Sequence, residues 1–300
     1  MSEYTYNDDK PSKLLTGYST VRGAELKSIY TFVGGGQDVT ETDIEERFGR
    51  PDFASGNTNT VHIDSCLRFL EAIDMIEISD TDVVSLTNDE FYPELESFEP
   101  RLLAHIRKQE GEQYHLSYLF DITAKQGTRR CSLEELLEVV KGDETNSFDL
   151  AWREEKLRMW ANLADHVGAL SYLSGDGENE IMTSPARPLL GELLSWYNEN
   201  GEDSKRFARA MEWIDSEFLG VFSDSLNIPT VSVGVADVLT NMVDDGVLTL
   251  RSMSDTEDVV ELPMPNGGTR RISTFNIERP FPQKPTYWYP LDRNERRMNT

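Results

Sequence analysis

The sequence predicts a mainly α-helical chain with short β-hairpins, an α+β fold. Apolar residues recur at helical spacing, as in Leu26, Ile29, Tyr30 and Val33, and this spacing places them on one face of a helix. Three times along the chain, a helical stretch runs into two short β-type runs separated by acidic residues. That pattern is typical of a helix followed by a hairpin. Because 38% of the 300 residues are hydrophobic, the chain can bury a sizeable core.

The first part of the chain is expected to form three helices and a hairpin. The glycines at 34–36 end the first helix, and the spacing of Thr40 and Asp43 resembles a capping box that opens the second. Asp80-Thr81-Asp82 separates two β-type runs and predicts the turn of the hairpin. The predicted elements are helices over 25–33, 40–48 and 60–75 and strands over 76–79 and 83–87.

This order of elements resembles the winged helix-turn-helix superfamily. The resemblance is carried by the spacing of Leu67, Leu70, Ile73 and Ile76 and by the hairpin that follows and ends in residues 83–87. It implies that the third helix packs its apolar face on the first two and that the hairpin covers the open edge of the core. No motif identifies a narrower family. The alternative is a helical bundle with incidental hairpins.

The same ending recurs twice more, which predicts a tandem array of related units. Met75, Ala169 and Val247 hold equivalent places, between the helix and the first strand of each ending. They are about 94 and 78 residues apart. Ser132 and Glu135 form a second capping box, at the start of a helix in the middle unit. That unit is expected to contain helices over 99–109, 113–124, 133–141 and 151–167 and strands near 170–173 and 180–183.

The third unit is the least regular of the three. Its helices are expected over 188–198, 205–222 and 233–244, with Phe218 and Phe222 on the apolar face of the long middle helix. A third hairpin is expected to pair residues 248–250 with residues 259–262.

The chain therefore divides into five predicted parts. Prolines and glycines recur from residue 263 onward and are unsuited to a core helix, and residues 270–300 carry seven basic against three acidic residues. The parts are a flexible arm over 1–20, winged helices over 21–92 and 97–184, a degenerate winged helix over 185–263, and an extended, basic, aromatic, proline-rich arm over 264–300.

Acidic residues dominate the composition. The chain has 54 Asp and Glu against 29 Lys and Arg, a net charge of −25, which argues against coating nucleic acid or anionic membrane through bulk positive charge. Only nine of the basic residues are lysine. Excess carboxylate with little lysine resembles proteins of salt-adapted microbes, especially haloarchaea; the alternative is an ordinary acidic protein. Without an apolar stretch long enough to span a bilayer, or a signal-peptide pattern, the protein is expected to be cytoplasmic.

Motifs for catalysis, cofactors and metals are not found. The glycines at 34–36 lack the Lys-Ser/Thr of a phosphate-binding loop. The four histidines have no metal-ligand spacing, and Cys66 and Cys131 are too few for a disulfide scaffold or a four-cysteine metal site. Asp149, with the acidic pair before Lys156, only faintly resembles a nuclease signature. We expect no enzyme activity, cofactor, metal or small-molecule ligand; an unrecognised active site is the weak alternative.

If the protein binds nucleic acid, we expect the middle unit to make the contact. The third helices and hairpins of the outer two units are acidic and would repel phosphate. The C-terminal arm offers two arginines as a phosphate clamp and three aromatic residues that could stack on bases or dock on a partner. The alternative is that the basic groups pair with nearby carboxylates. The candidate nucleic-acid-binding residues are Lys125, Arg129, Arg130, Arg153, Lys156, Arg158, Arg270 and Arg271, and the candidate partner-binding residues are Tyr287, Trp288 and Tyr289.

The sequence thus favours a non-enzymatic adaptor, with winged helices that bind proteins inside a DNA-associated assembly. Winged-helix subunits of chromosome-organising and phage-defence complexes are similar in architecture. The alternative function is a sequence-specific, DNA-binding transcriptional regulator. The expected partners are proteins, with double-stranded DNA as a further candidate and no membrane.

Overall fold

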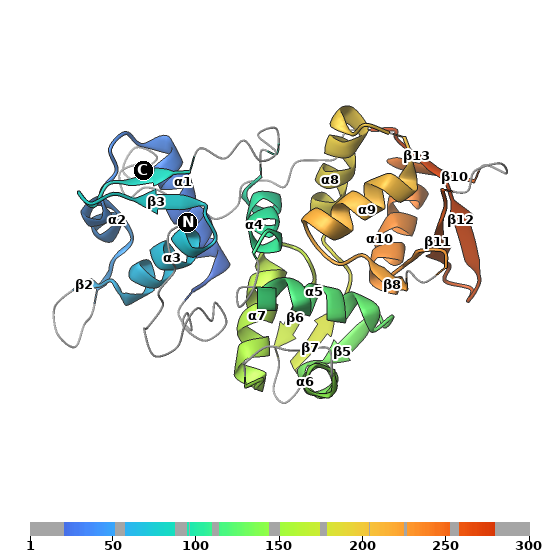
Figure 1. The fold of residues 1–300 in the computed structure, drawn as a ribbon, viewed down its shortest axis with the longest axis horizontal. Coiled ribbons are helices and arrows are strands. Elements are labelled where there is room, and N and C mark those ends of the chain that lie inside the picture. Colours follow the sequence, from blue (N-terminus) through green and yellow to red (C-terminus); the bar gives the residue numbers. More distant parts are fainter. Residues whose placement is uncertain are drawn as a thin grey trace, which may run out of the picture.

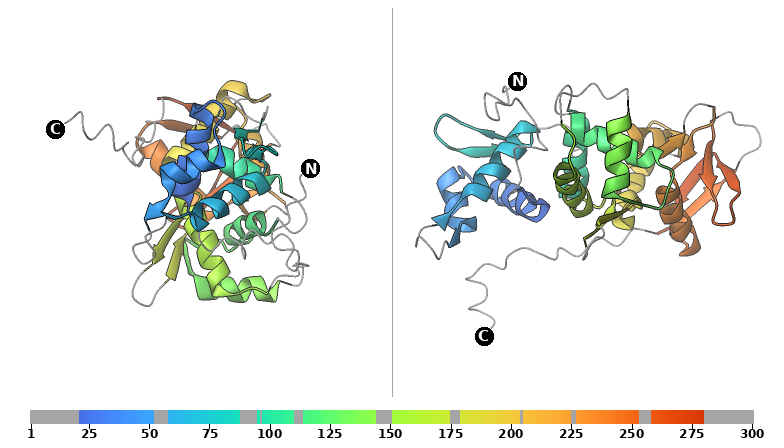
Figure 2. Two further views of the ribbon diagram at one scale, coloured as in Figure 1. Left: turned by 90° about the vertical axis from the view of Figure 1, so that its left-hand side faces the viewer. Right: turned by 90° about the horizontal axis from the view of Figure 1, so that it is seen from below.

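The computed structural model shows an α+β fold, as the sequence predicts (Figure 1). It describes residues 21–51, 58–87, 95, 97–109, 114–143, 151–174, 179–203, 205–224, 227–252 and 258–279. Three segments follow one another along the long axis of the molecule (Figures 1 and 2). We call residues 21–87 the first segment, 98–183 the middle segment and 187–279 the third segment. None of the helices formed by the described residues is long and apolar enough to cross a membrane.

The first segment has the predicted three helices and hairpin. The Thr40 hydroxyl accepts from the backbone N–H of Asp43, whose carboxylate accepts from the backbone N–H of Thr40, so the capping box is confirmed. The hairpin is also confirmed, because Ile76 pairs with Leu86. The elements are α1 (Gly23–Gly35), α2 (Glu41–Phe48), β1 (Arg50–Pro51), β2 (Thr58–Asn59), α3 (Val61–Ala72), β3 (Ile76–Ile78) and β4 (Val84–Leu86).

The middle segment has four helices and a three-stranded sheet. Ser132 and Glu135 form the predicted capping box at the start of α6. The strand order β5-β7-β6 places β7 in the centre, paired antiparallel on both sides. The elements are α4 (Phe98–Arg107), α5 (His115–Lys125), β5 (Arg130–Ser132), α6 (Leu133–Gly142), α7 (Glu154–His166), β6 (Ser171–Ser174) and β7 (Asn179–Met182).

The prediction of one long middle helix over 205–222 in the third segment is wrong. It ends at Glu217, and Phe222 lies in a strand instead of on the helix. The carboxylate of Asp215 accepts from the backbone N–H groups of Val221 and Phe222 at 2.7 and 3.3 Å, which turns the chain back on itself. The elements are α8 (Arg187–Asn200), α9 (Phe207–Glu217), β8 (Phe222–Asp224), β9 (Thr230–Val231), α10 (Val233–Asp244), β10 (Leu248–Arg251), β11 (Val260–Pro263), β12 (Thr269–Ile272) and β13 (Thr274–Ile277).

Two further predictions for this segment are also wrong: the third hairpin, and a C-terminal arm that begins at residue 264. β10 does not pair with β11; it pairs with β13, while β11 pairs with β12 and β9. Ile272 and Phe275 are buried, so β12 and β13 gain apolar contacts that the proline and glycine pattern did not reveal. Residues 264–279 therefore belong to the folded third segment, and 280–300 lie outside the described residues.

The three segments repeat one connection order. In each, a helix (α1, α5 or α8) leads to a short extended stretch, two more helices and a strand, and the extended stretch bonds to a later strand, β4, β7 or β13. The middle segment has α4 in addition, before this set, and the third segment has β8 and β9 between its second and third helices and β11 and β12 before β13. The third helix ends in each case at a residue in the left-handed conformation, the usual stop signal of a helix. Those residues are Asp74 (φ 61°), Gly168 (φ 76°) and Gly246 (φ 65°). The equivalent strand bonds run from Val84 N to Val39 O (2.7 Å), Thr183 N to Arg129 O (3.1 Å) and Phe275 N to Lys205 O (3.1 Å).

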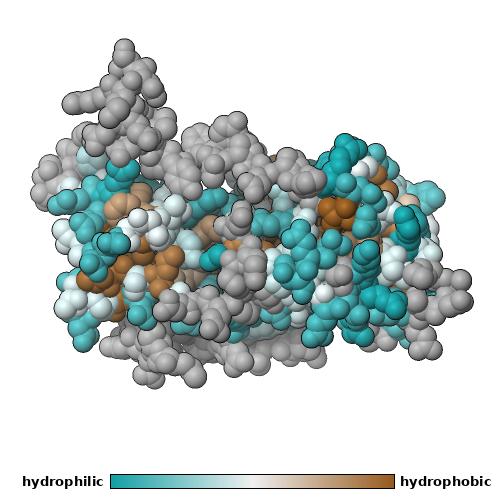
Figure 3. All heavy atoms as spheres, turned by 90° about the horizontal axis from the view of Figure 1, so that it is seen from above, coloured by the Kyte–Doolittle hydropathy of each residue, from teal (hydrophilic) through white to brown (hydrophobic). Residues whose placement is uncertain are grey.

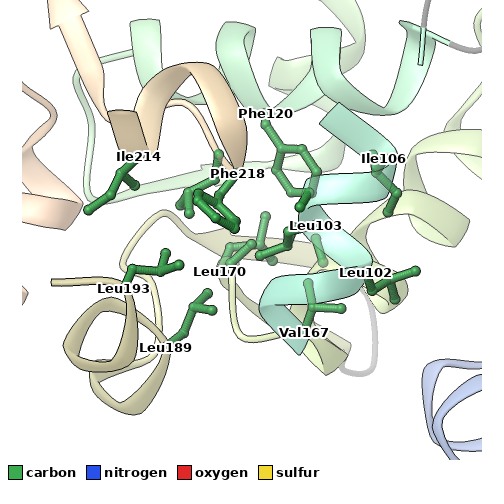
Figure 4. Packing of buried hydrophobic residues seen from close by; sticks show 14 of the residues in the cluster. Leu102, Leu103, Ile106, Phe120, Val167, Leu170, Leu189, Leu193, Ile214 and Phe218 are labelled. Atoms are coloured by element: carbon green, nitrogen blue, oxygen red, sulfur yellow. The ribbon is translucent and has the colours of Figure 1, made fainter. Parts of the chain in front are cut away.

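One hydrophobic core runs through the segments. Around α4, side chains of the middle and third segments interleave (Figure 4). The first segment is joined to α4 by the Lys27–Glu99 ion pair at 2.9 Å and by His105 Nδ1, which lies 2.8 Å from the carbonyl oxygen of Ile73. The labelled residues of the shared core in Figure 4 are Leu102, Leu103, Ile106, Phe120, Val167, Leu170, Leu189, Leu193, Ile214 and Phe218.

Candidate nucleic-acid interface

The basic residues of the middle segment lie in two separate groups. One group is at the N-terminal half of α7, which packs on β6, and the other lies at the end of α5 and in β5. β5 and β6 are the two edges of the sheet (Figure 1), so the two groups are separated by the central strand β7. The α7 group is Arg153, Lys156 and Arg158, and the β5 group is Lys125, Arg129 and Arg130.

Carboxylates already bind two members of the β5 group. Arg129 donates from Nε and Nη2 to the carboxylate of Asp237 in the third segment, at 2.5 and 3.0 Å. These bonds raise the pKa of Arg129. Arg130 pairs with Glu180 on the neighbouring strand β7, while Lys125 is exposed at the end of α5. A phosphate would have to compete with both carboxylates for these arginines.

The α7 group is more open. Arg158 Nη2 donates to Glu154 Oε1 at 2.7 Å, and the same oxygen accepts from Asn179 Nδ2 on β7 at 3.0 Å. The hydrogen bond to Glu154 raises the pKa of Arg158. Lys156 donates to a backbone carbonyl just before the helix, and Arg153 is exposed at the N-cap. Among the described residues, no ion pair is found between Arg153 and a carboxylate.

The N-terminal turn of α10 is covered by the middle segment. Gly234, Val235 and Ala236 are buried, and a methyl group on Gly234 would lie 2.4 Å from the carbonyl oxygen of Thr183. DNA-reading helices of the helix-turn-helix type contact bases with their N-terminal residues. α10 therefore cannot enter a groove without opening this junction.

Acidic residues surround α3 in the first segment. Burial raises the pKa of Glu41, and the charges of Asp82 and Asp64 raise it further. This shift indicates a concentration of negative charge beside α3. His62 is buried with Nε2 3.3 Å from the carbonyl oxygen of Phe48, and burial lowers its pKa. Arg68 is exposed, but the local field opposes phosphate.

The two arginines assigned to the C-terminal arm lie instead on β12, and both are exposed. Arg270 Nη2 donates to the carbonyl oxygen of Leu250 at 2.9 Å, and Arg271 Nε lies 3.3 Å from Glu261 Oε1. The predicted aromatic partner-binding residues, Tyr287, Trp288 and Tyr289, lie outside the described residues.

Sequence reasoning missed a buried polar cluster between the middle and third segments. Arg107 donates to the carboxylate of Asp121 at 2.6 Å and to the carbonyl oxygens of Ser117 and Asp215. Tyr114 also donates to Asp121, at 3.0 Å. Burial raises the pKa of the Asp215 carboxyl. Since Arg107 and Asp215 are 108 positions apart, no local pattern could have linked them.

A small cavity lies at the same junction. Its volume of about 20 Å³ is room for about one water molecule, and its polar lining comes from Thr123, Thr183 and Ser232. Within the described part of the chain, no group of three or more His, Cys, Asp or Glu side chains is arranged to hold a metal ion.

Comparison with protein-family models, curated proteins and solved structures finds no match to this chain.

Proposed function

We propose that the chain is a non-enzymatic adaptor of three tandem winged helices that binds proteins within a DNA-associated assembly. The repeated connection order supports the winged-helix assignment. So does the left-handed residue that follows α3, α7 and α10, because each time it directs the chain from a helix into a strand, β3, β6 or β10.

The observation that carries the adaptor proposal is the internal use of the third helices. The N-terminal turn of α10 is buried against Thr183. At the other junction, α1 covers the C-terminal end of α7, where a methyl group on Gly23 would lie 2.1 Å from the His166 ring. The end of α10 that a DNA reader keeps open is thus covered, and the two junctions together hold the segments in place, which suits a rigid platform for partners.

Apolar surface on the first segment supports a protein partner. Its half-buried apolar side chains include Phe32, Phe48, Ile78 and Leu86, and Val61 is 59% exposed. On the face seen from above, apolar atoms gather over this segment (Figure 3). Contiguous apolar surface with a polar surround is typical of interaction sites.

A DNA-binding regulator is the second candidate, and the open N-terminal half of α7 favours it. Arg153 and Arg158 are exposed beside the β6–β7 hairpin, so this helix and hairpin could both reach a duplex. Each lost phosphate contact should weaken binding and flatten its dependence on salt.

Fluorescence anisotropy with labelled duplex DNA, at low and at molar KCl, separates the two candidates. The test variant is Arg153→Ala/Arg158→Ala. The matched control is Lys141→Ala/Arg209→Ala, which likewise removes two exposed cations; these two pair with Glu138 and Glu212. Binding that only the α7 variant loses would establish the regulator surface, while absence of binding by the wild type eliminates the regulator.

Affinity capture from native extract tests the adaptor directly. We expect DNA-handling proteins, such as an ATPase or a nuclease, to co-purify in stoichiometric amounts. A chain recovered alone after gentle cross-linking contradicts the adaptor proposal.

A further inference from the structure

The tip of the β11–β12 hairpin holds an asparagine in an unusual setting. Met264 N donates to Gly268 O at 2.8 Å, and Gly267 N donates to Met264 O at 3.0 Å. Gly267 has φ 84°, so Pro265, Asn266 and Gly267 form a three-residue hairpin loop with glycine at its left-handed position. The Asn266 side-chain oxygen accepts from Gly268 N at 3.1 Å, which folds the carboxamide back over the peptide unit of Gly267.

We propose that Asn266 is a site of spontaneous covalent modification, in which its side-chain amide is converted to a carboxylate. The backbone nitrogen of Gly267 attacks the side-chain carbonyl carbon of Asn266 and loses its proton to base. The carboxamide nitrogen takes up a proton from the conjugate acid of that base as its C–N bond breaks, ammonia leaves, and a five-membered succinimide ring remains. Water then adds to either ring carbonyl and opens the ring to aspartate or to isoaspartate, with no change in oxidation state.

Three features of the tip promote this reaction. The hydrogen bond from Gly268 N to the Asn266 side-chain oxygen polarises the carbonyl group that is attacked, and a donor aimed at that oxygen stabilises the negative charge that develops on it. Gly267 has no side chain to obstruct the attack. Asn266, Gly267 and Gly268 are all exposed, so base and water reach the site.

A second Asn-Gly step in the same chain provides an internal comparison. Asn200 ends α8, and its Nδ2 donates to the carbonyl oxygen of Trp196 at 3.1 Å. The carboxamide is therefore held back along the helix. The nitrogens of Gly201 and Gly267 both donate to a backbone carbonyl oxygen, at 2.8 and 3.0 Å, so the two sites differ in how the asparagine side chain is held. The fold thus protects Asn200 and leaves Asn266 reactive, although the dipeptide is the same.

The modification would change the charge of a basic strand. A new carboxylate at Asn266 lies at the loop that leads into Arg270 and Arg271 on β12. Isoaspartate also adds a methylene to the backbone, which is incompatible with the spacing of the Met264–Gly268 bonds. The hairpin would therefore become less basic and less regular as the protein ages.

Peptide mapping by mass spectrometry tests the proposal on the full, unmodified chain after incubation in mildly alkaline buffer. In the folded protein we expect Asn266 to convert about tenfold or more faster than Asn200, which corresponds to a modest difference in positioning. In urea the two rates should become equal, because both steps lose their structure. The Asn266→Gln variant identifies the peptide that carries the product.

Two results overturn the proposal. Equal rates in the folded protein, or faster conversion of Asn200, would show that the hairpin loop does not promote the reaction. A preference for Asn266 that persists in urea would assign the difference to neighbouring sequence and not to the fold.

Discussion

Replacing Arg107 tests whether the middle and third segments unfold as one block. Its side chain is 8% exposed and pairs with Asp121, which is 21% exposed. Arg107→Met keeps most of the aliphatic stem but removes every donor to Asp121 and to the carbonyl oxygens of Ser117 and Asp215. Leaving a buried charge without its partner costs about 3–5 kcal/mol. Because Asp121 keeps some contact with water, we expect a loss of about 3 kcal/mol in the free energy of unfolding.

Urea titrations followed by circular dichroism and by tryptophan fluorescence measure this loss. The wild type should unfold in one transition seen by both probes. Arg209→Met is the control, because Arg209 is 52% exposed and an exposed pair contributes about 0–1 kcal/mol. Adding Asp121→Asn to Arg107→Met should recover part of the loss, since no unpaired charge remains. A loss below about 1 kcal/mol for Arg107→Met would refute the reasoning.

Three further predictions concern the junction, pH and salt. Gly234→Val should cost about 1–3 kcal/mol in urea titrations because its side chain would collide with Thr183, while Gly142→Ala, which meets no atom within 4 Å, should be neutral; equal effects contradict the packing. Burial raises the folded pKa of Asp215 above its ordinary 3.8, so its contribution to stability is present below that value and declines as pH rises through the folded pKa. Asp215→Asn should remove this decline relative to the wild type, and parallel pH profiles would argue against it. With a net charge of −25, the chain should melt at a higher temperature in molar KCl than in dilute buffer; equal or greater stability at low salt rules out salt adaptation.

Local signals predicted the helices well. The capping boxes at Thr40 and Ser132 each join residues three positions apart, so the sequence window that carries the signal also contains the whole interaction. The first hairpin was predictable for the same reason, because its strands are separated by only a short acidic turn. Helix periodicity likewise needs only a few consecutive turns to be recognised.

Signals at long range were missed or misread. β10 does not pair with β11, the next strand in the sequence; it pairs with β13, with Leu248 opposite Ile277. No local sequence pattern distinguishes between these two partners. The end of α9 depends on a carboxylate that captures two later backbone N–H groups. Prolines and glycines from residue 263 onward suggested an arm, yet those at 263–268 lie at the end of β11 and in the loop between β11 and β12; the prolines from 280 onward lie outside the described residues.

The candidate site shows the same division. The sequence identified exposed basic residues, and Arg153 and Arg158 are indeed on the surface of α7. It did not identify their partners: Arg129 binds Asp237, which is 108 positions away. Nor did it show that β5 and β6, the strand on which α7 packs, are the two edges of one sheet.

The amino-acid sequence alone determined the acidic charge, the positions of most helices and the hairpins that follow α3 and α7, because periodicity, capping and turn formation act over a few residues. Tertiary structure alone decided which strands pair in the third segment, which carboxylates bind the arginines and which third helix is covered. Those outcomes depend on groups that are distant in the chain and meet only when apolar surface is buried.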